Sequence, residues 1–418
     1  MTPHLINAQT GKRTALFVPS VGARHVFVSV PLGDGIPFVQ RLRHHQFSAA
    51  IIRLLRQHGH VVECGLVVPD EGRYYGLERL DDLVDKTPWE NTTLRDLVGL
   101  PLAQPNNIDL PKTDRNGPIQ VIANSSMQAT HTPTNDFLAE IHEGGLWDVC
   151  IAQGIDGLAP TGTSIEATAQ PTEARTQTIR LNIGLTNLID EDGVALSNDV
   201  VFKMVAAYTP TVLRYVLLRF AAFAKPLEFS SAHLEHAAGR VAYAYRSIQA
   251  ARRFVHQFES LESEIVKDEQ RLLRIENQAR GALSENFDSP TILAAVDEIC
   301  RRVNEYASTK STGARPVAVA TTRRLLRLFD EIDGVLGLFS DEPTEYLAQH
   351  RKLALRRRSL DVKEIEKLIS RRVAARTGRD WSIADDIKRQ LEAKGVMLKD
   401  REGATDWFLI ESADIELC

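Results

Sequence analysis

The sequence predicts an α/β domain with a parallel sheet, followed by an all-α helical bundle and a small C-terminal helical module. Short β-branched runs alternate with a helical pattern in the first third of the chain. After residue 200, long patterns rich in Ala, Leu, Arg and Glu dominate. The chain has 418 residues, 43% hydrophobic and 25% charged, which suits a globular protein of two or three domains. We expect these parts to span residues 1–200, 201–350 and 351–418.

The N-terminal part begins with a strand, a helix and a second strand. Residues 25–30 form a β-branched and aromatic run, and a Gly- and Pro-rich turn follows. Residues 42–58 place apolar side chains at helical spacing, Gly59 marks the helix end, and residues 61–68 form another apolar strand. This order predicts a βαβ unit, which is the seed of a parallel sheet.

The remaining elements follow from the same patterns. Further strands are expected at residues 120–124 and 149–155, and an apolar segment covers residues 179–188. Helical patterns then cover residues 232–285, 290–309, 316–337, 363–376 and 383–394.

Cysteine usage indicates a reducing compartment. The four cysteines (Cys64, Cys150, Cys300 and Cys418) include no CxxC pair and predict free thiols. Residues 1–13 lack the apolar core of a signal peptide, and no apolar run reaches membrane-spanning length. We therefore expect a cytoplasmic protein with no membrane partner. The net charge of −5 argues against a globally basic surface.

The last segment carries the most specific pattern in the chain. It contains IEKLI at residues 365–369, then Ala375-Arg376, Arg379-Asp-Trp381, Ala384-Asp385-Asp-Ile387, Gly395-Val396 and Gly403-Ala-Thr405-Asp-Trp407. This pattern closely resembles the C-terminal helical region of cysteinyl-tRNA synthetases. Matches to the same family continue upstream in the same order, at residues 5–12, 210–218, 226–230, 282–290 and 334–337.

The resemblance implies a class I synthetase architecture. Residues 1–200 would form a Rossmann-type catalytic-like domain with a shortened insertion. Residues 201–350 would form a helical bundle that contacts the tRNA stem, and residues 351–418 an anticodon-binding-like module. ATP is the cofactor and tRNA the partner that this family would bring.

The family's catalytic signatures are altered in this chain. The HIGH motif, whose histidines contact the phosphates of ATP, falls on Phe38-Val39-Gln40-Arg41. Arg41 is a candidate to meet a phosphate. His44 and His45, one turn later, are weaker catalytic candidates, and the alternative is that they are surface histidines of the helix.

The second signature, KMSKS, falls on residues 194–199 and has lost both lysines. Ser197 remains as a cofactor-binding candidate, while Asp199 adds a negative charge. A preorganised cation aimed at developing charge is worth about 3 kcal/mol, so the loss of several predicts very little adenylation.

Of two further sites of the family, the ribose site has candidate residues in this chain, whereas the zinc site lacks its ligands. Gly154-Ile155-Asp156 resembles the class I GGxDL turn, so Gly154 and Asp156 are candidates for a ribose site, with a plain turn as the alternative. The first zinc cysteine of the family corresponds to Ser29, and the HHENE stretch falls near residues 161–164. Zinc needs thiolate, imidazole or carboxylate ligands, so we expect no zinc.

A basic window near the C-terminus is the candidate RNA surface. Residues 351–379 hold eleven cations and three acidic residues, a net charge of +8, which leaves −13 on the rest of the chain. A solvated charged face is the alternative. The candidates for contacts with RNA phosphates and bases are Arg356, Arg357, Arg358, Arg371, Arg372, Arg376 and Trp407. The alternative for Trp381 and Trp407 is that they pack inside the module.

Three functions remain open from the sequence. The leading hypothesis is a synthetase-like protein with a degenerate active site, which binds tRNA or assists an active enzyme or a biosynthetic partner. The alternative is an ATP-dependent amino-acid-activating ligase that uses Arg41, His44 or His45. The third is a structural partner subunit without RNA affinity.

Overall fold

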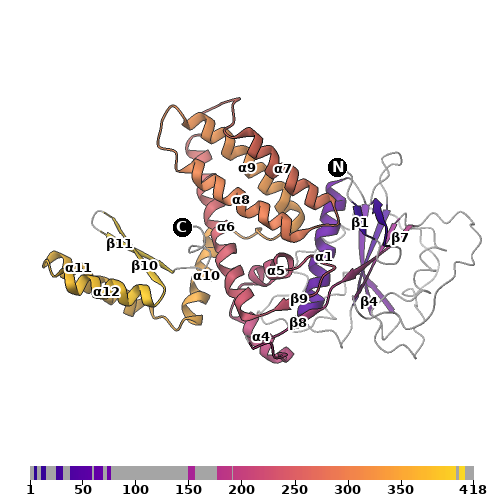
Figure 1. Ribbon diagram of the computed structural model, residues 1–418, viewed down its shortest axis with the longest axis horizontal. Coiled ribbons are helices and arrows are strands. Elements are labelled where there is room, and N and C mark those ends of the chain that lie inside the picture. Colours follow the sequence, from indigo (N-terminus) through magenta and orange to yellow (C-terminus); the bar gives the residue numbers. More distant parts are fainter. Residues whose placement is uncertain are drawn as a thin grey trace, which may run out of the picture.

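The structure is a computed structural model that describes residues 4–6, 11–15, 25–31, 38–58, 61–68, 73–76, 149–155, 177–190, 192–401 and 404–409. The molecule is elongated, with a sheet at one end, helices in the middle and the C-terminal module at the other end (Figure 1). The strand that the sequence predicts at residues 120–124 lies outside the described residues.

The predicted βαβ unit is confirmed. Strand β3 (His25–Pro31) pairs in parallel with β4 (Val61–Val68), and helix α1 (Phe38–Gln57) connects them. The apolar and β-branched side chains of both strands favour an extended backbone in a sheet that is covered by a helix.

Five further strands complete the two N-terminal sheets. Strands β6 (Val149–Ile155) and β7 (Gln177–Ile183) extend the sheet in parallel, and β5 (Arg73–Gly76) adds an antiparallel edge. The order is β5-β4-β3-β6-β7, so the chain leaves β3 for one side of the sheet and returns to the other. The carboxyl ends of β3 and β6 therefore form a topological switch point, where α/β sheets bind ligands. A separate antiparallel pair joins β1 (His4–Ile6) to β2 (Arg13–Ala15).

Helix α1 lies between this sheet and the helical bundle (Figure 1). It contacts β3 and β4 on one side, and α5 (Pro210–Arg219) and α9 (Arg315–Leu336) on the other. Side chains on every face of α1 are therefore buried between Phe38 and Leu55, except that Arg53 is half-buried. The side chain of Arg41 lies outside the described residues.

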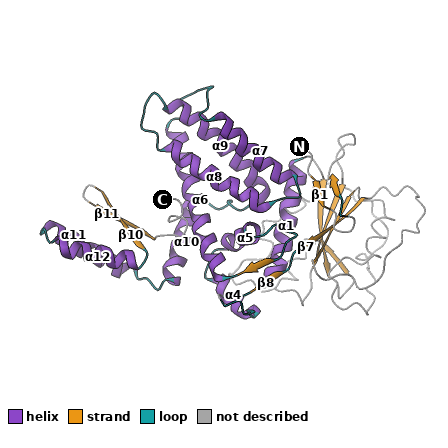
Figure 2. Ribbon diagram, in the orientation of Figure 1, coloured by secondary structure: helices purple, strands orange, loops and turns teal. Residues whose placement is uncertain are grey.

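Helices make up the middle of the molecule, whereas the strands gather mainly at its sheet end (Figure 2). The apolar segment at residues 179–188 divides at Gly184 into β7 and β8 (Thr186–Leu188), and β8 pairs with β9 (Leu227–Phe229). The bundle helices are α4 (Asn198–Ala206), α5, α6 (Ser231–Gln257), α7 (Glu269–Ser284), α8 (Ser289–Ala307) and α9. A single cluster of buried apolar side chains joins α1 to these helices.

One helix prediction is wrong in the bundle. Residues 232–285 do not form one helix, because α6 ends at Gln257 and α7 begins only at Glu269. Asp268, which precedes α7, has a left-handed backbone with φ of 54°. The dense charged residues of this segment are typical of a helix, which is why one continuous helix was predicted. Ion pairs between exposed side chains, however, contribute little to the stability of a helix.

The C-terminal module is not purely helical, which corrects the prediction. Helix α10 (Pro343–Arg357) leads to the hairpin of α11 (Val362–Thr377) and α12 (Trp381–Ala393). Strands β10 (Val396–Arg401) and β11 (Ala404–Leu409) then form an antiparallel pair. A second apolar cluster, separate from that of the bundle, holds the module together: Ala354, Ile365, Ile387, Leu391, Val396 and Leu409.

Among the described helices, no single one is long and apolar enough to cross a membrane. One bent pair, Asp199–Ala206 with Pro210–Arg219, passes the length and composition test only jointly, and it bends by 113°.

Candidate functional site

The first turn of α1 holds residues 38–41, the expected position of the HIGH motif. The Phe38 ring meets the Phe202 ring edge-on, with centroids 5.7 Å apart. Gln40 donates from Nε2 to the carbonyl of Gly184 at 3.2 Å and accepts from the backbone N–H of Thr186 at 2.7 Å. These side chains are therefore engaged in joining α1 to the segment after β7. Arg41 belongs to α1, but its side chain lies outside the described residues.

Arg43, which sequence reasoning missed, is the cation that holds this junction. Its Nη1 donates to the Gly184 carbonyl at 2.8 Å, and its Nη2 donates to the carbonyls of Lys225 at 2.8 Å and Ala222 at 3.1 Å. Burial lowers the pKa of Arg43 to about 10, so it stays charged at neutral pH. The only sequence signal was a charged residue inside a largely apolar helical pattern.

His44 and His45 are not surface histidines, which corrects that expectation. Both side chains are 0% exposed, because α1 is covered by the sheet on one side and by helices on the other. The Nε2 atoms of His44 and Gln40 lie 3.2 Å apart. Their catalytic role remains a prediction.

Of the ribose and zinc candidates, Gly154 and Ser29 lie in the carboxyl-terminal halves of the central strands β6 and β3. Gly154 is the next-to-last residue of β6 and is paired with Asn182 of β7. Ser29 lies in β3, opposite Gly65 of β4. Asp156, the Ser29 side chain and residues 161–164 lie outside the described residues, so the ribose site and the expected lack of zinc remain predictions.

Ser197 begins a helix. Its Oγ accepts a hydrogen bond from the backbone N–H of Val200 at 3.4 Å, which makes it the N-cap of α4. Asp199 is exposed in the first turn of the same helix, where the helix dipole favours a negative charge. Ser197 and Asp199, in the segment expected at the KMSKS position, thus serve local helix formation.

The GVLG match at residues 334–337 marks the end of α9. Gly337 has a left-handed backbone with φ of 60° and caps the helix. Arg53 donates to the carbonyl of Leu336 at 3.1 Å, and buried Arg214 donates to that of Gly337. Because helix C-termini favour cations, these arginines fasten α1 and α5 to α9.

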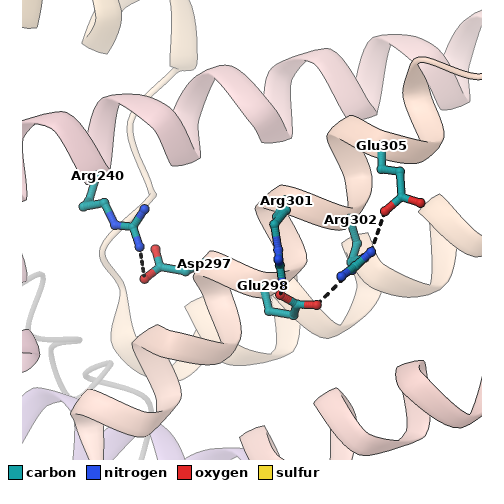
Figure 3. A network of polar contacts seen from close by, with 6 residues as sticks. All are labelled: Arg240, Asp297, Glu298, Arg301, Arg302 and Glu305. Carbon is teal, nitrogen blue, oxygen red and sulfur yellow. Dashed lines mark hydrogen bonds and ion pairs between the residues drawn. The ribbon is translucent and has the colours of Figure 1, made fainter. Parts of the chain in front are cut away.

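The charges of α8 are largely neutralised by their neighbours. Asp297 accepts from Arg240 of α6 at 3.0 Å (Figure 3). It also lies 3.5 Å from Arg219, and burial raises the pKa of Asp297. The other pairs run along the helix and are also drawn in Figure 3: Glu298 with Arg301 and Arg302, and Arg302 with Glu305.

Two of the RNA candidates, Arg357 and Arg358, hold one carboxylate. The nitrogens Nη2 of Arg357 and Nη2 of Arg358 each lie 3.2 Å from an oxygen of Glu235 on α6. Arg357 also donates to the carbonyl of Ala207 at 3.0 Å and stacks 3.9 Å above the Tyr208 ring. This group, Arg357, Arg358, Glu235 and Tyr208, is called the Glu235 clasp below.

Two more candidates are paired inside the C-terminal module. Arg372 is buried and donates two parallel hydrogen bonds to Asp400 of β10, at 2.8 and 3.0 Å. Arg376 donates to the same carboxylate at 2.5 Å, and Thr405 at 2.9 Å. The bond from Arg372 is the leading cause that holds the pKa of Asp400 well below its usual range. This network pins the hairpin of strands to α11.

The remaining cations of α11 face solvent. Lys363, Lys367 and Arg371 are exposed and follow one another at intervals of four residues, so they share one face of α11. Within the part of the chain that the structure describes, none of these three side chains forms an ion pair. We call them the α11 stripe. Arg356, at the end of α10, is exposed as well.

The two tryptophans of the module differ in setting. Trp407 is half-buried against the apolar cluster of the module, and the Arg351 guanidinium covers its ring at 4.0 Å. Trp381 is 57% exposed, so the packing interpretation is wrong for this residue. An exposed indole beside cations is the better candidate to stack on a base.

Comparison with known proteins gives cysteine–tRNA ligases among the sequence relatives. No protein-family model matches the chain. The cysteine–tRNA ligase of Pelobacter propionicus is 27% identical over 215 residues, 49% of this chain and 43% of the ligase. That of Bacillus licheniformis is 28% identical over 240 residues, 56% of this chain and 46% of the ligase. The chain thus spans less than half of the length of these curated relatives.

Solved structures give more distant likenesses. A putative arginyl-tRNA synthetase from Campylobacter jejuni has a TM-score of 0.45 and 12% identity, covering 77% of this chain and 94% of the other. Methionyl-tRNA synthetase from Mycobacterium tuberculosis, in complex with methionyl-adenylate, has a TM-score of 0.40 and 12% identity, covering 78% and 93%. From the sequence relatives, and as the C-terminal pattern predicted, the chain is a divergent cysteinyl-tRNA-synthetase-like protein.

Proposed function

We propose that this chain binds tRNA through its C-terminal module and that its N-terminal domain no longer performs the ligase reaction. The observation that carries the proposal is the α11 stripe. Lys363, Lys367 and Arg371 follow one another at about 6 Å along the helix axis, and none of them forms an ion pair within the described residues. Such a row of solvated cations suits a phosphate backbone, which releases counterions when it is bound.

Exposed Trp381 supports the same proposal. It lies at the first position of α12, beside the turn that ends α11. Stacking of a base on an aromatic ring contributes about 1–3 kcal/mol and tolerates any base. Cations that follow the backbone, together with an aromatic ring that takes a base, form the usual combination for single-stranded RNA loops.

The packing of α1 supports the loss of ligase activity. A phosphate site at a helix start needs free backbone N–H groups and cationic side chains. Here Phe38 and Gln40 are buried against Phe202, Gly184 and Thr186. In the second signature no lysine remains, and the helix start carries Asp199.

The test is a fluorescence anisotropy titration of labelled unfractionated tRNA at several salt concentrations. The triple variant K363Q/K367Q/R371Q should bind more weakly and lose about 2–3 units from the slope of log K against log salt, because each phosphate contact contributes about 0.7–0.9. The matched control R280Q/R301Q/R389Q removes the same charge from side chains that are ion-paired with Glu331, Glu298 and Asp386. Equal losses in both variants, or no binding to the wild type at low salt, would refute the proposal.

A second function is favoured by the sheet. The carboxyl ends of β3 and β6 form a switch point of the kind that holds nucleotides, with Gly154 at the end of β6. An ATP-dependent ligase would use Arg41 there. Pyrophosphate exchange with each amino acid separates the two: the leading proposal predicts no exchange above background. Robust cysteine-dependent exchange that Arg41→Ala abolishes would establish the ligase instead.

A further inference from the structure

The Glu235 clasp joins two parts of the molecule that have separate apolar cores. Glu235 lies in α6, within the bundle, whereas Arg357 and Arg358 end α10 just before the module. The first half of α10 packs into the bundle through Tyr346, and its second half packs into the module through Ala354.

Arg358 also touches the module itself. A Cβ placed on Gly395, between α12 and β10, would lie 3.1 Å from Nη1 of Arg358. The next residue, Ser359, has a left-handed backbone with φ of 51°, which is uncommon for a residue other than glycine. The chain therefore bends directly after two arginines that both lie against Glu235.

In the clasp, two arginines lie within ion-pair distance of one carboxylate. Two guanidinium groups converge on the two oxygens of Glu235, and the Tyr208 hydroxyl donates a third contact at 3.0 Å. A phosphate group offers the same kind of acceptor oxygens with more charge, and arginine pairs with both groups through its planar fork. Glu235 itself is 38% exposed, so a competing anion has access from solvent.

We propose that Glu235 is an internal substitute for an RNA phosphate. In the free protein Glu235 holds Arg357 and Arg358, and bound tRNA displaces it, taking both arginines and releasing the C-terminal module from α6. The proposal rests on the proposed tRNA binding and adds its regulation. It also explains why two of the predicted RNA-binding arginines are paired in the structure.

The test compares tRNA affinity in two single variants. Glu235→Gln keeps the shape of the side chain but removes the competing charge, so tRNA should bind about 3- to 10-fold more tightly, since each partly exposed ion pair changes an equilibrium by up to about 5-fold. Glu228→Gln is the matched control, because Glu228 is an exposed glutamate of β9 with no ion pair among the described residues. It should leave the affinity within about 1.5-fold.

Arg357 and Arg358 must carry the gain. In the background R357Q/R358Q, tRNA should bind more weakly than to the wild type, and Glu235→Gln should then add nothing. Tyr208→Phe, which keeps the ring beneath Arg357 but removes the hydroxyl donor, should give a smaller gain of about 2-fold and serves if Glu235→Gln lowers the thermal midpoint.

The outcomes separate the two proposals. If tRNA binds the wild type but Glu235→Gln and Tyr208→Phe bring no gain, the internal substitute is refuted and tRNA binding stands. A gain that persists in the R357Q/R358Q background also refutes it. If no variant binds tRNA at low salt, both proposals fall.

Discussion

Replacement of Gly184 by alanine should strongly destabilise the junction between the sheet and the bundle. Gly184 follows β7 directly, and its backbone passes close to the loop that precedes β9. An added Cβ would lie 2.0 Å from the carbonyl oxygen of Lys225 and 2.7 Å from the nitrogen of Pro226, whereas real Cβ contacts stay above 3.0 Å. Because both neighbours are backbone atoms, no side chain can rotate away.

The loss of stability can be estimated from the contacts that the added methyl group would displace. The Gly184 N–H donates to Phe223 at 2.7 Å, and its carbonyl accepts from Arg43 at 2.8 Å. Overpacking costs about 1–3 kcal/mol, and each buried hydrogen bond that is broken adds about 1 kcal/mol. We expect Gly184→Ala to lower the free energy of unfolding by about 3 kcal/mol.

Gly281 provides the matched control. It lies in α7, and an added Cβ would meet no atom within 4 Å. Alanine there should raise stability by about 0.5–1 kcal/mol, because glycine is a poor helix former. Urea unfolding followed by circular dichroism at 222 nm should place Gly184→Ala below the wild type and Gly281→Ala above it. A Gly184→Ala midpoint equal to that of the wild type would refute the close approach.

Three further predictions concern the module and the bundle. Asp400→Asn should lower the thermal midpoint of unfolding above pH 5, and the difference from the wild type should shrink as the pH falls below about 4. The reason is that the pKa of Asp400 is lower in the folded protein than in the unfolded chain. The carboxylate therefore stabilises the fold above the unfolded-state pKa and loses this effect when it is protonated. Unfolding across a pH series measures this, and a constant difference would contradict it. Trp381→Ala should weaken tRNA binding by about 5-fold or more with little loss of stability, whereas Trp407→Ala should lower the midpoint, because only Trp407 packs in the module. Cys300 is fully buried and its thiol pKa is raised by that burial, so mass spectrometry should find it unalkylated by iodoacetamide until the protein unfolds; modification in the native state would count against the buried position.

Local patterns were sufficient for the regular elements. The β-branched runs of β3 and β4 and the apolar spacing of α1 predicted the βαβ unit, and the helix ranges for α8, α9, α11 and α12 agree to within two residues. These elements follow from periodicity within one segment, which is the strongest signal that a single sequence carries.

Two predictions were wrong because packing against distant parts of the chain, and not the local pattern, determines the structure there. The surface interpretation of His44 and His45 assumed a helix with one solvated face, yet α1 is covered on both sides. The hairpin of β10 and β11 was missed because residues 351–418 were assigned to a helical module as a whole. Its stability comes instead from buried Val396 and Leu409, together with the bonds that Asp400 makes to α11.

Charge counting found the basic window but not the partners of its arginines. The carboxylates that occupy them come from distant elements: Glu235 precedes Arg357 by more than a hundred residues, and Asp400 lies two elements after Arg372. The net charge of one sequence window carries no information about pairs with residues outside that window. Only the structure separates the α11 stripe, which faces solvent, from arginines that hold the module in place.

The salt dependence of tRNA affinity tests the central claim most directly. The wild type should bind tRNA with a steep dependence on salt, and the variant K363Q/K367Q/R371Q should bind more weakly with a slope smaller by about 2–3 units. Slopes that are equal in the two proteins would contradict the account, because tRNA would then be bound elsewhere or not at all.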